Sequence, residues 1–243
     1  FEWLNRNLFQ GVYTRQQSFF DQSELSSSGR PASGIELKLL EPFAKEVRPA
    51  ILEGTWTPPR SDGSGRDRQR MQAAIALLAE AGYGLRNGQI VNDRTGEPLA
   101  LEFLALSRDQ ERIGLAFADS LRPLGINLKV RFVDSSLYWR RLRTFDFDTM
   151  IWSYGVSASP GTEQPNRFSS AAAGREASLN YAGVRSPAVD VLLDSLRRAT
   201  TRDEFVAAIR ALDRVLLSGH YVLPLYYSPE RWLARQAKVR RPE

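Results

Sequence analysis

An ordered alternation of strand and helix patterns between residues 98 and 153 is the feature that most constrains the fold of this chain. PLALEFLAL (98–106) indicates a buried strand, and INLKVRFV (126–133) alternates as a strand with one polar face does. DTMIWS (148–153) indicates a third strand. Helical spacing follows Ser107 and again Asp134, two residues that suit helix starts. Because this order requires crossover connections, we expect parallel neighbouring strands in an α/β layer.

Helical patterns flank this region on both sides. MQAAIALLAEAGY (71–83) has helical spacing and ends near glycine. Ser186 precedes a proline at a first helical position, and TRDE (201–204) contains a capping box. YVLPLYY (221–227) indicates a strand that its proline limits to an edge or an end. The predicted fold class is therefore α/β, with helices on both faces of a sheet.

Charge and composition exclude several classes of protein. The 243 residues carry a net charge of +5 from 29 Arg and 4 Lys against 28 acids, but the arginines are scattered, so we expect no nucleic-acid partner. The absence of cysteine excludes a disulfide scaffold and a thiolate metal site, and we expect neither metal nor cofactor. The chain begins with Phe1, and FEWLNRNLFQ (1–10) resembles the end of a helix, so we expect either a removed leader or a piece of a longer chain.

The loop WSYGVSASPGTEQP (152–165) follows the third predicted strand. Ligands of open α/β sheets tend to lie beyond the carboxyl ends of the strands, where this loop begins. It has aromatic faces at Trp152 and Tyr154, hydroxyls at Ser157 and Ser159, and accessible backbone near Gly155. These groups suit a polar ligand that is stacked and hydrogen bonded, not one that is cleaved.

Catalytic patterns are weak in this sequence, and we predict that the chain is not an enzyme. His220 is the only histidine, and no G-x-S-x-G motif presents a serine nucleophile. A hydrolase acting on peptide or sugar derivatives through carboxylates such as Asp146, Asp148 or Glu163 stays open as the alternative. A nucleic-acid binder using the arginines is a further alternative, and its affinity would fall steeply with salt.

Several blocks, in order, resemble the C-terminal part of the extracytoplasmic solute-binding proteins of peptide-type ABC transporters, the oligopeptide, dipeptide and nickel binder superfamily. They are FEWLNRNLFQGVYTRQQSFFDQSEL, AIALLAEAGY, the run from PLALEFLAL to DFDTMIWSYG, LNYAGVRSPAVDVLLDSL and HYVLPLYYSPERWLAR. The SPGTEQ and FFDQSEL segments are most similar to the YejA-type branch. The likeness covers essentially the whole chain.

The resemblance implies a type II periplasmic binding protein-like lobe with a mixed sheet. Residues 1–65 would be a hinge-side segment packing on the lobe, and residues 66–243 the second lobe of a two-lobed periplasmic clamp whose first lobe is absent. The whole protein would be a monomer that binds a peptide-like solute and delivers it to ABC permease subunits in the inner membrane. The expected ligand contacts are Trp152, Tyr154, Gly155, Ser157, Ser159, Arg15, Gln17 and Asn180.

One position departs from the family pattern. Peptide binders of the family often carry an Asp three residues after the strand tryptophan, where it pairs with the free amino terminus of the ligand. Here that position is Gly155, so the charge-assisted anchor is missing from the loop. Glu163 is the candidate replacement further along the chain.

Overall fold

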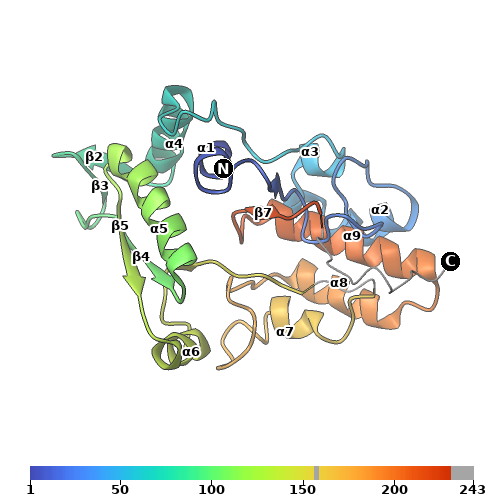
Figure 1. Ribbon diagram of the computed structural model, residues 1–243. Coiled ribbons are helices and arrows are strands. Elements are labelled where there is room, and N and C mark those ends of the chain that lie inside the picture. Colours follow the sequence, from blue (N-terminus) through green and yellow to red (C-terminus); the bar gives the residue numbers. More distant parts are fainter. Residues whose placement is uncertain (156–158, 231–243) are drawn as a thin grey trace, which may run out of the picture.

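The computed structural model describes residues 1–155 and 159–230. Figure 1 shows two groups of elements with three short elements between them. The sheet group consists of α4 (Arg68–Glu80), β2 (Tyr83–Arg86), β3 (Gln89–Asn92), β4 (Ala100–Ala105), α5 (Arg108–Leu121), a 3-10 turn (Arg122–Leu124), β5 (Asn127–Phe132), α6 (Ser135–Arg143) and β6 (Thr149–Met150). The helical group consists of α2 (Gly34–Leu40), a 3-10 helix (Glu41–Glu46), α3 (Pro49–Leu52), α7 (Gln164–Phe168), α8 (Pro187–Arg198) and α9 (Arg202–Ser218). Between the groups lie α1 (Glu2–Leu8), β1 (Thr14–Arg15) and β7 (Tyr226–Tyr227).

The three-stranded sheet confirms the predicted parallel crossovers. Strand β4 lies between β5 and β6 and is parallel to both, with Phe103 opposite Val130 on one side and Thr149 on the other. The antiparallel pairs form two separate two-stranded sheets, β2 with β3 and β1 with β7. The predicted α/β fold class is confirmed. In place of the expected mixed sheet, the described residues form one parallel sheet and two separate antiparallel pairs.

Helices cover both faces of the parallel sheet, because neighbouring residues of a strand point to opposite sides. Phe103 on β4 packs in the cluster that includes Phe117 of α5. The next residue, Leu104, packs against Tyr138 and Leu142 of α6. Helix α5 approaches the sheet closely at Gly114, where a Cβ would lie 2.6 Å from Cδ1 of Phe103. A larger residue there would push the helix away from the strand.

The helix starts predicted from capping residues are confirmed. Asp134 accepts a hydrogen bond from the backbone N–H of Leu137 at 3.0 Å. Thr201 and Glu204 form the reciprocal capping box at the start of α9. Ser107 and Ser186 likewise accept from the backbone of the first turns of α5 and α8. Local side chains therefore begin these helices where the sequence predicts.

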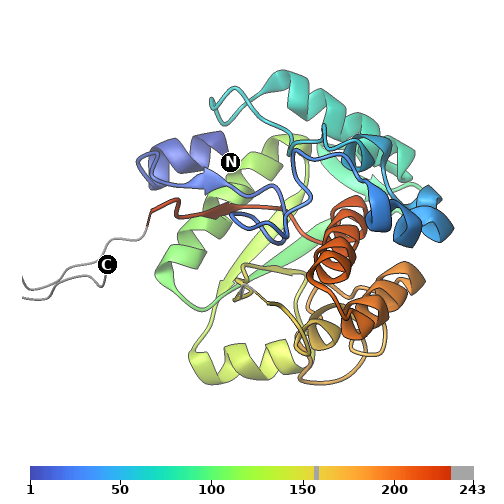
Figure 2. The same ribbon diagram turned by 90° about the vertical axis from the view of Figure 1, so that its right-hand side faces the viewer.

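Two predicted strands are much shorter in the structure. The apolar run at 148–153 pairs only over β6, and the run at 221–227 only over β7. Pro224 has no N–H to donate, so the second run joins a sheet only after it. Strand β7 lies beside the N-terminal segment (Figure 2), where Thr14 is opposite Tyr227. This pairing brings the two ends of the described chain together.

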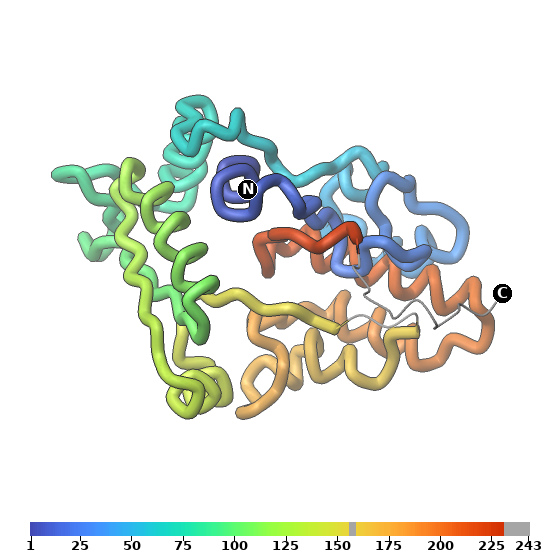
Figure 3. Tube along the Cα trace, in the orientation of Figure 1, coloured from blue at the N-terminus to red at the C-terminus, as the bar shows by residue number. Residues whose placement is uncertain are grey.

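The helical group has its own core, which combines early and late residues of the chain. Leu40, Val47 and Ile51 pack in one cluster with apolar residues of α8 and α9 such as Leu192 and Leu212. Two stretches without helix or strand, residues 53–67 and 151–155, connect this group to the sheet group (Figure 3). The predicted division at residue 65 into a hinge-side segment and a lobe stays a prediction.

A buried charge on α9 holds the early segment against this core. Arg214 is fully buried and pairs with Glu36, which is 4% exposed. The same guanidinium donates to the carbonyl oxygens of Arg30 at 2.6 Å, of Leu52 at 3.3 Å and of Ile51. Among the described residues, all partners of the Arg214 guanidinium thus lie between residues 30 and 52.

We expect Arg214→Met to lower the free energy of unfolding of the full-length protein by about 3–5 kcal/mol, because Glu36 is left buried without a partner. Adding Glu36→Gln should recover part of the loss, because it removes the unpaired charge but leaves the carbonyls of residues 30, 51 and 52 without this donor. The control is Arg197→Met, which breaks a pair with Asp194 that is exposed and should cost about 0.5 kcal/mol or less. Urea unfolding measures all three, and equal losses for Arg214→Met and Arg197→Met would contradict the role of the buried pair.

Candidate ligand pocket

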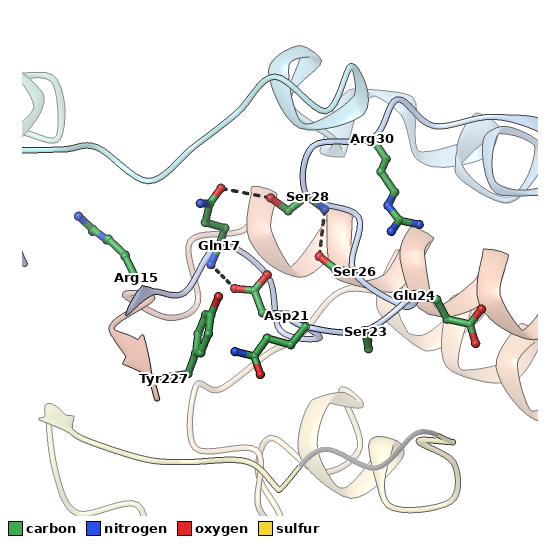
Figure 4. Close-up of a pocket in the computed structure, with 10 residues that line it drawn as sticks. Arg15, Gln17, Asp21, Ser23, Glu24, Ser26, Ser28, Arg30 and Tyr227 are labelled. Carbon is green, nitrogen blue, oxygen red and sulfur yellow. Dashed lines mark hydrogen bonds between the residues drawn. The ribbon is translucent and has the colours of Figure 1, made fainter. Parts of the chain in front are cut away.

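An open polar pocket of about 490 Å³ lies where β1 and β7 meet the loop of residues 16–33 (Figure 4). Arg15 of β1 and Tyr227 of β7 line one side of it. Residues of the loop line the rest: Gln17, Asp21, Gln22, Ser23, Glu24, Ser26, Ser28 and Arg30. Most of these side chains are polar or charged, so the pocket can hold a polar ligand by hydrogen bonds.

Short-range hydrogen bonds shape the loop. The backbone N–H of Gln17 donates to Asp21 at 2.6 Å, and the hydroxyl of Ser28 donates to the side-chain oxygen of Gln17 at 3.3 Å (Figure 4). Ser26 accepts from the backbone N–H of Ser28 at 3.2 Å, and Ser23 donates to the carbonyl of Phe20 at 2.7 Å. Serine and aspartate side chains favour such local bonds over regular structure, so QQSFFDQSELSSS forms an ordered loop.

The base of the loop is bound to Asp213 of α9, which is fully buried. Its carboxylate accepts hydrogen bonds from the hydroxyl of Ser18, the backbone N–H of Phe19, and both the backbone N–H and the hydroxyl of Ser27. Burial raises the pKa of Asp213, and these four bonds act in the opposite direction. Sequence reasoning missed this residue. The sequence signal for a buried charge here was an acidic residue next to a basic one within the largely apolar run RALDRVLL.

Charged groups of both signs line the pocket. The guanidinium of Arg15 donates to the carbonyl of Pro59 at 2.7 Å and lies 3.6 Å from a carboxylate oxygen of Glu2. Its Nε is buried and has no hydrogen-bond partner among residues 1–155 and 159–230. Burial raises the pKa of Asp21, opposed by hydrogen bonds from the backbone N–H groups of Gln17 and Ser18. Arg15 and Asp21 are therefore each held in place on the pocket wall by neighbouring groups.

The structure places Arg15 and Gln17, two of the residues predicted from the sequence, together on the pocket wall. Trp152 is half-buried elsewhere, with its ring centroid 4.7 Å from that of Tyr181 and 6.2 Å from that of Trp139. These contacts are edge-to-face, so an aromatic cluster holds the indole at the end of β6.

Tyr154 connects the predicted ligand loop (152–165) to the pocket loop (16–33) through aromatic contacts. Its hydroxyl donates to the carbonyl of Leu179 at 3.2 Å, and its ring centroid lies 5.4 Å from that of Phe168. The ring centroid of Phe168 lies 5.6 Å from that of Phe19. The backbone N–H of Phe19 binds Asp213 at one end of the pocket loop. The guanidinium of Arg167 lies 5.3 Å above the Tyr154 ring. A chain of aromatic contacts therefore joins residue 154 to residue 19.

The remaining predicted contacts have different surroundings. Gly155 is exposed, and a Cβ there would meet nothing within 4 Å. Ser159 is exposed, and Ser157 lies outside the described residues. Asn180 is fully buried, and its amide bonds the carbonyls of Ser169 and Val184 and the N–H of Val184. The side-chain amide of Asn180 is already hydrogen bonded to these backbone groups. Asn180 is therefore not part of the proposed contact surface.

The carboxylates of the hydrolase alternative have partners of their own. Asp146 pairs with Arg141 at 2.8 Å, and Asp148 accepts from the backbone N–H of Glu102 at 2.7 Å. Glu163 accepts from the N–H of Gly161 and from the amide of Gln164. Burial by itself would raise the pKa of Glu163, but these bonds and its own backbone N–H outweigh it, and the pKa falls. Each of the three carboxylates is thus engaged by a neighbouring group, and Asp148 links its segment to β4.

Residues 1–155 and 159–230 contain no group of three or more His, Cys, Asp or Glu side chains that could hold a metal ion. None of the helices in this described part has the length and apolar content needed to cross a membrane.

Residues 1–175 match the family model described as bacterial extracellular solute-binding proteins, family 5 middle. The chain belongs to this family. The match includes β1, the pocket loop and the whole parallel sheet. The resemblance to solute-binding proteins of peptide-type transporters is therefore confirmed.

Individual relatives agree with the family. The probable peptide-binding protein YejA of Agrobacterium fabrum is 44% identical over 243 residues, and the peptidoglycan-binding protein YepA of the same organism is 42% identical. All of this chain is matched in both cases, but the chain spans only 39% of the length of each relative. These relatives are named as binding proteins, not as enzymes.

Solved structures confirm the fold. A dipeptide-binding protein of Pseudoalteromonas in complex with Met-Leu has a TM-score of 0.62 and is 16% identical, over 93% of this chain and 36% of that one. At this identity the similarity shows the fold, which is that of a type II periplasmic binding protein.

Burial raises the pKa of Tyr154 to about 12. An unfolded tyrosine has a pKa of about 10, so the folded state holds its proton more tightly, and stability is lost as the pH rises through this range. Between pH 8 and pH 11 we expect Tyr154 to account for a loss of about 1 kcal/mol in the free energy of unfolding. Comparing urea unfolding of the wild type and Tyr154→Phe across this range isolates the effect. Identical pH dependence of the two proteins would contradict it.

Proposed function

We propose that this chain is part of the solute-binding component of an ABC importer that binds an oligopeptide-like ligand. The observation that carries the proposal is the polar pocket of about 490 Å³ on a chain of the family 5 solute-binding proteins. Its wall offers hydroxyl, amide, carboxylate and guanidinium groups. Such groups complement the alternating donors and acceptors of peptide bonds.

This chemistry and the names of the relatives support the proposed ligand class. The relative YejA is named as a probable peptide-binding protein, and YepA as a peptidoglycan-binding protein. Arg15 and Gln17 would provide polar contacts from the pocket wall. Trp152 and Tyr154 would contribute aromatic surface, and backbone groups near Gly155 and the hydroxyls of Ser157 and Ser159 would pair with peptide-like amides.

The setting we propose is a two-lobed periplasmic protein in which this chain supplies the second lobe and its hinge side. Ligand binding would favour a closed arrangement of the lobes, because the closed state makes contacts that the open state lacks. The closed monomer would deliver its ligand to permease subunits in the inner membrane, without cofactor, nucleic acid or catalysis.

Native mass spectrometry of the full-length protein purified from its host tests this function. We expect a carried-over ligand that contains peptide bonds. Calorimetry with a pool of synthetic tri- to pentapeptides should then show binding by the full-length protein, whereas the 243-residue chain alone should bind at least about tenfold more weakly, since half of the contacts are absent. Turnover of a bound ligand that is lost in Asp148→Asn would instead support the hydrolase.

Gly155 gives a specific prediction about the ligand terminus. Without a carboxylate at this position, the full-length protein should bind N-acetylated and free peptides of the same sequence with affinities within about threefold. Gly155→Asp should favour the free peptide by about tenfold, because a carboxylate can pair with the amino terminus and space for it is open. Gly155→Asn is the control for size without charge. If Gly155→Asp shows no preference between the two peptides, residue 155 does not face the ligand terminus.

A further inference from the structure

The residues that line the pocket come mostly from one loop, and a single side chain binds both ends of that loop. Eight of the lining residues lie between residues 17 and 30, without helix or strand. Ser18 and Ser27, near the two ends of this stretch, both bind Asp213 of α9. The shape of the pocket wall therefore depends on a residue that does not line it.

The geometry of the carboxylate leaves few alternatives to an aspartate. Its Oδ1 accepts from the backbone N–H of Phe19 at 2.8 Å. Its Oδ2 accepts from Ser18 Oγ at 2.8 Å, from the backbone N–H of Ser27 at 3.0 Å and from Ser27 Oγ at 2.6 Å. Each oxygen thus faces a backbone N–H, which can only donate. An ionised carboxylate is the side chain of this size that accepts on both atoms.

We propose that Asp213 is a positioning residue for ligand binding, which holds the two ends of the pocket loop together so that its polar side chains face the ligand in one arrangement. The proposal rests on the proposed function, in which this pocket holds the solute. Asp213 itself is fully buried and does not line the pocket. If the pocket wall is already ordered before binding, no binding free energy is spent on ordering it, and the affinity is higher.

Asparagine is the informative substitution, because it preserves the shape of the side chain but cannot preserve its bonds. If its NH₂ replaces Oδ1, it faces the N–H of Phe19, and if it replaces Oδ2, it faces the N–H of Ser27. In both orientations two donors oppose each other, so one end of the loop is released. Ser27→Ala is milder, since it removes one hydroxyl and leaves both backbone donors bound.

The experiment uses the full-length protein and has two readouts. In Asp213→Asn we expect amide hydrogen exchange at Phe19 or Ser27 to accelerate about tenfold or more, while the amides of α8 keep wild-type rates. Affinity for the pool of tri- to pentapeptides should fall by about tenfold or more, and by about threefold or less in Ser27→Ala.

The control is Ile90→Ala in the cluster beneath α4, which should lower stability without changing the affinity or the exchange at residues 19 and 27. Exchange that rises throughout α8 and α9 with unchanged affinity would mean that Asp213 only stabilises the fold, and would overturn the proposal. Unchanged exchange at both amides would overturn it as well. If the wild type binds none of the peptides, the proposed function fails, and exchange at residues 19 and 27 still decides whether Asp213 orders the loop.

Discussion

Two adjacent buried side chains of α9, Asp213 and Arg214, bind segments that lie between 162 and 195 residues away in the sequence. Asp213 binds the ends of the pocket loop, and Arg214 binds Glu36 and the carbonyls of residues 30, 51 and 52. Buried charges are tolerated only when they are paired and hydrogen bonded, so each has a strict requirement for its partners. The path of residues 18–52 over the helical group follows from satisfying these two charges.

The same constraint connects the fold to ligand binding. A loop rich in serine and glutamine would sample many conformations by itself. Its internal hydrogen bonds and its bonds to α9 hold it in a single conformation. Asp21, Ser23 and Ser26 of the pocket wall are held in place by these bonds to the backbone of the loop. The aromatic contacts from Phe19 through Phe168 to Tyr154 connect this wall to the segment that leaves the parallel sheet. The pocket loop and the end of β6 are thereby parts of one packed region.

Local patterns predicted the parallel sheet and the helix starts well. The alternation in 126–133 and the capping residues Asp134 and Thr201 are local signals, which depend on only a few neighbouring residues. The structure confirms the strand and both helix starts that they predict. Pairings between distant segments were not predictable in the same way. Strands β1 and β7 have two residues each, too few for a periodic signal, and α7 is a single short turn of helix. Arg15 and Gln17 were predicted by resemblance, whereas most of the pocket wall around them was not.

The sequence by itself determined the class of the fold, the order of its strands and helices and the family, because hydrophobic period, capping residues and ordered blocks are all readable along one chain. It also determined that residue 155 carries no charge. Only the tertiary structure decided which polar residues form the pocket and that Asn180 is occupied by backbone groups. The physical reason is that a hydrogen bond such as Ser27 to Asp213 depends on a distance in space of 2.6 Å, which a separation of 186 residues in sequence does not encode.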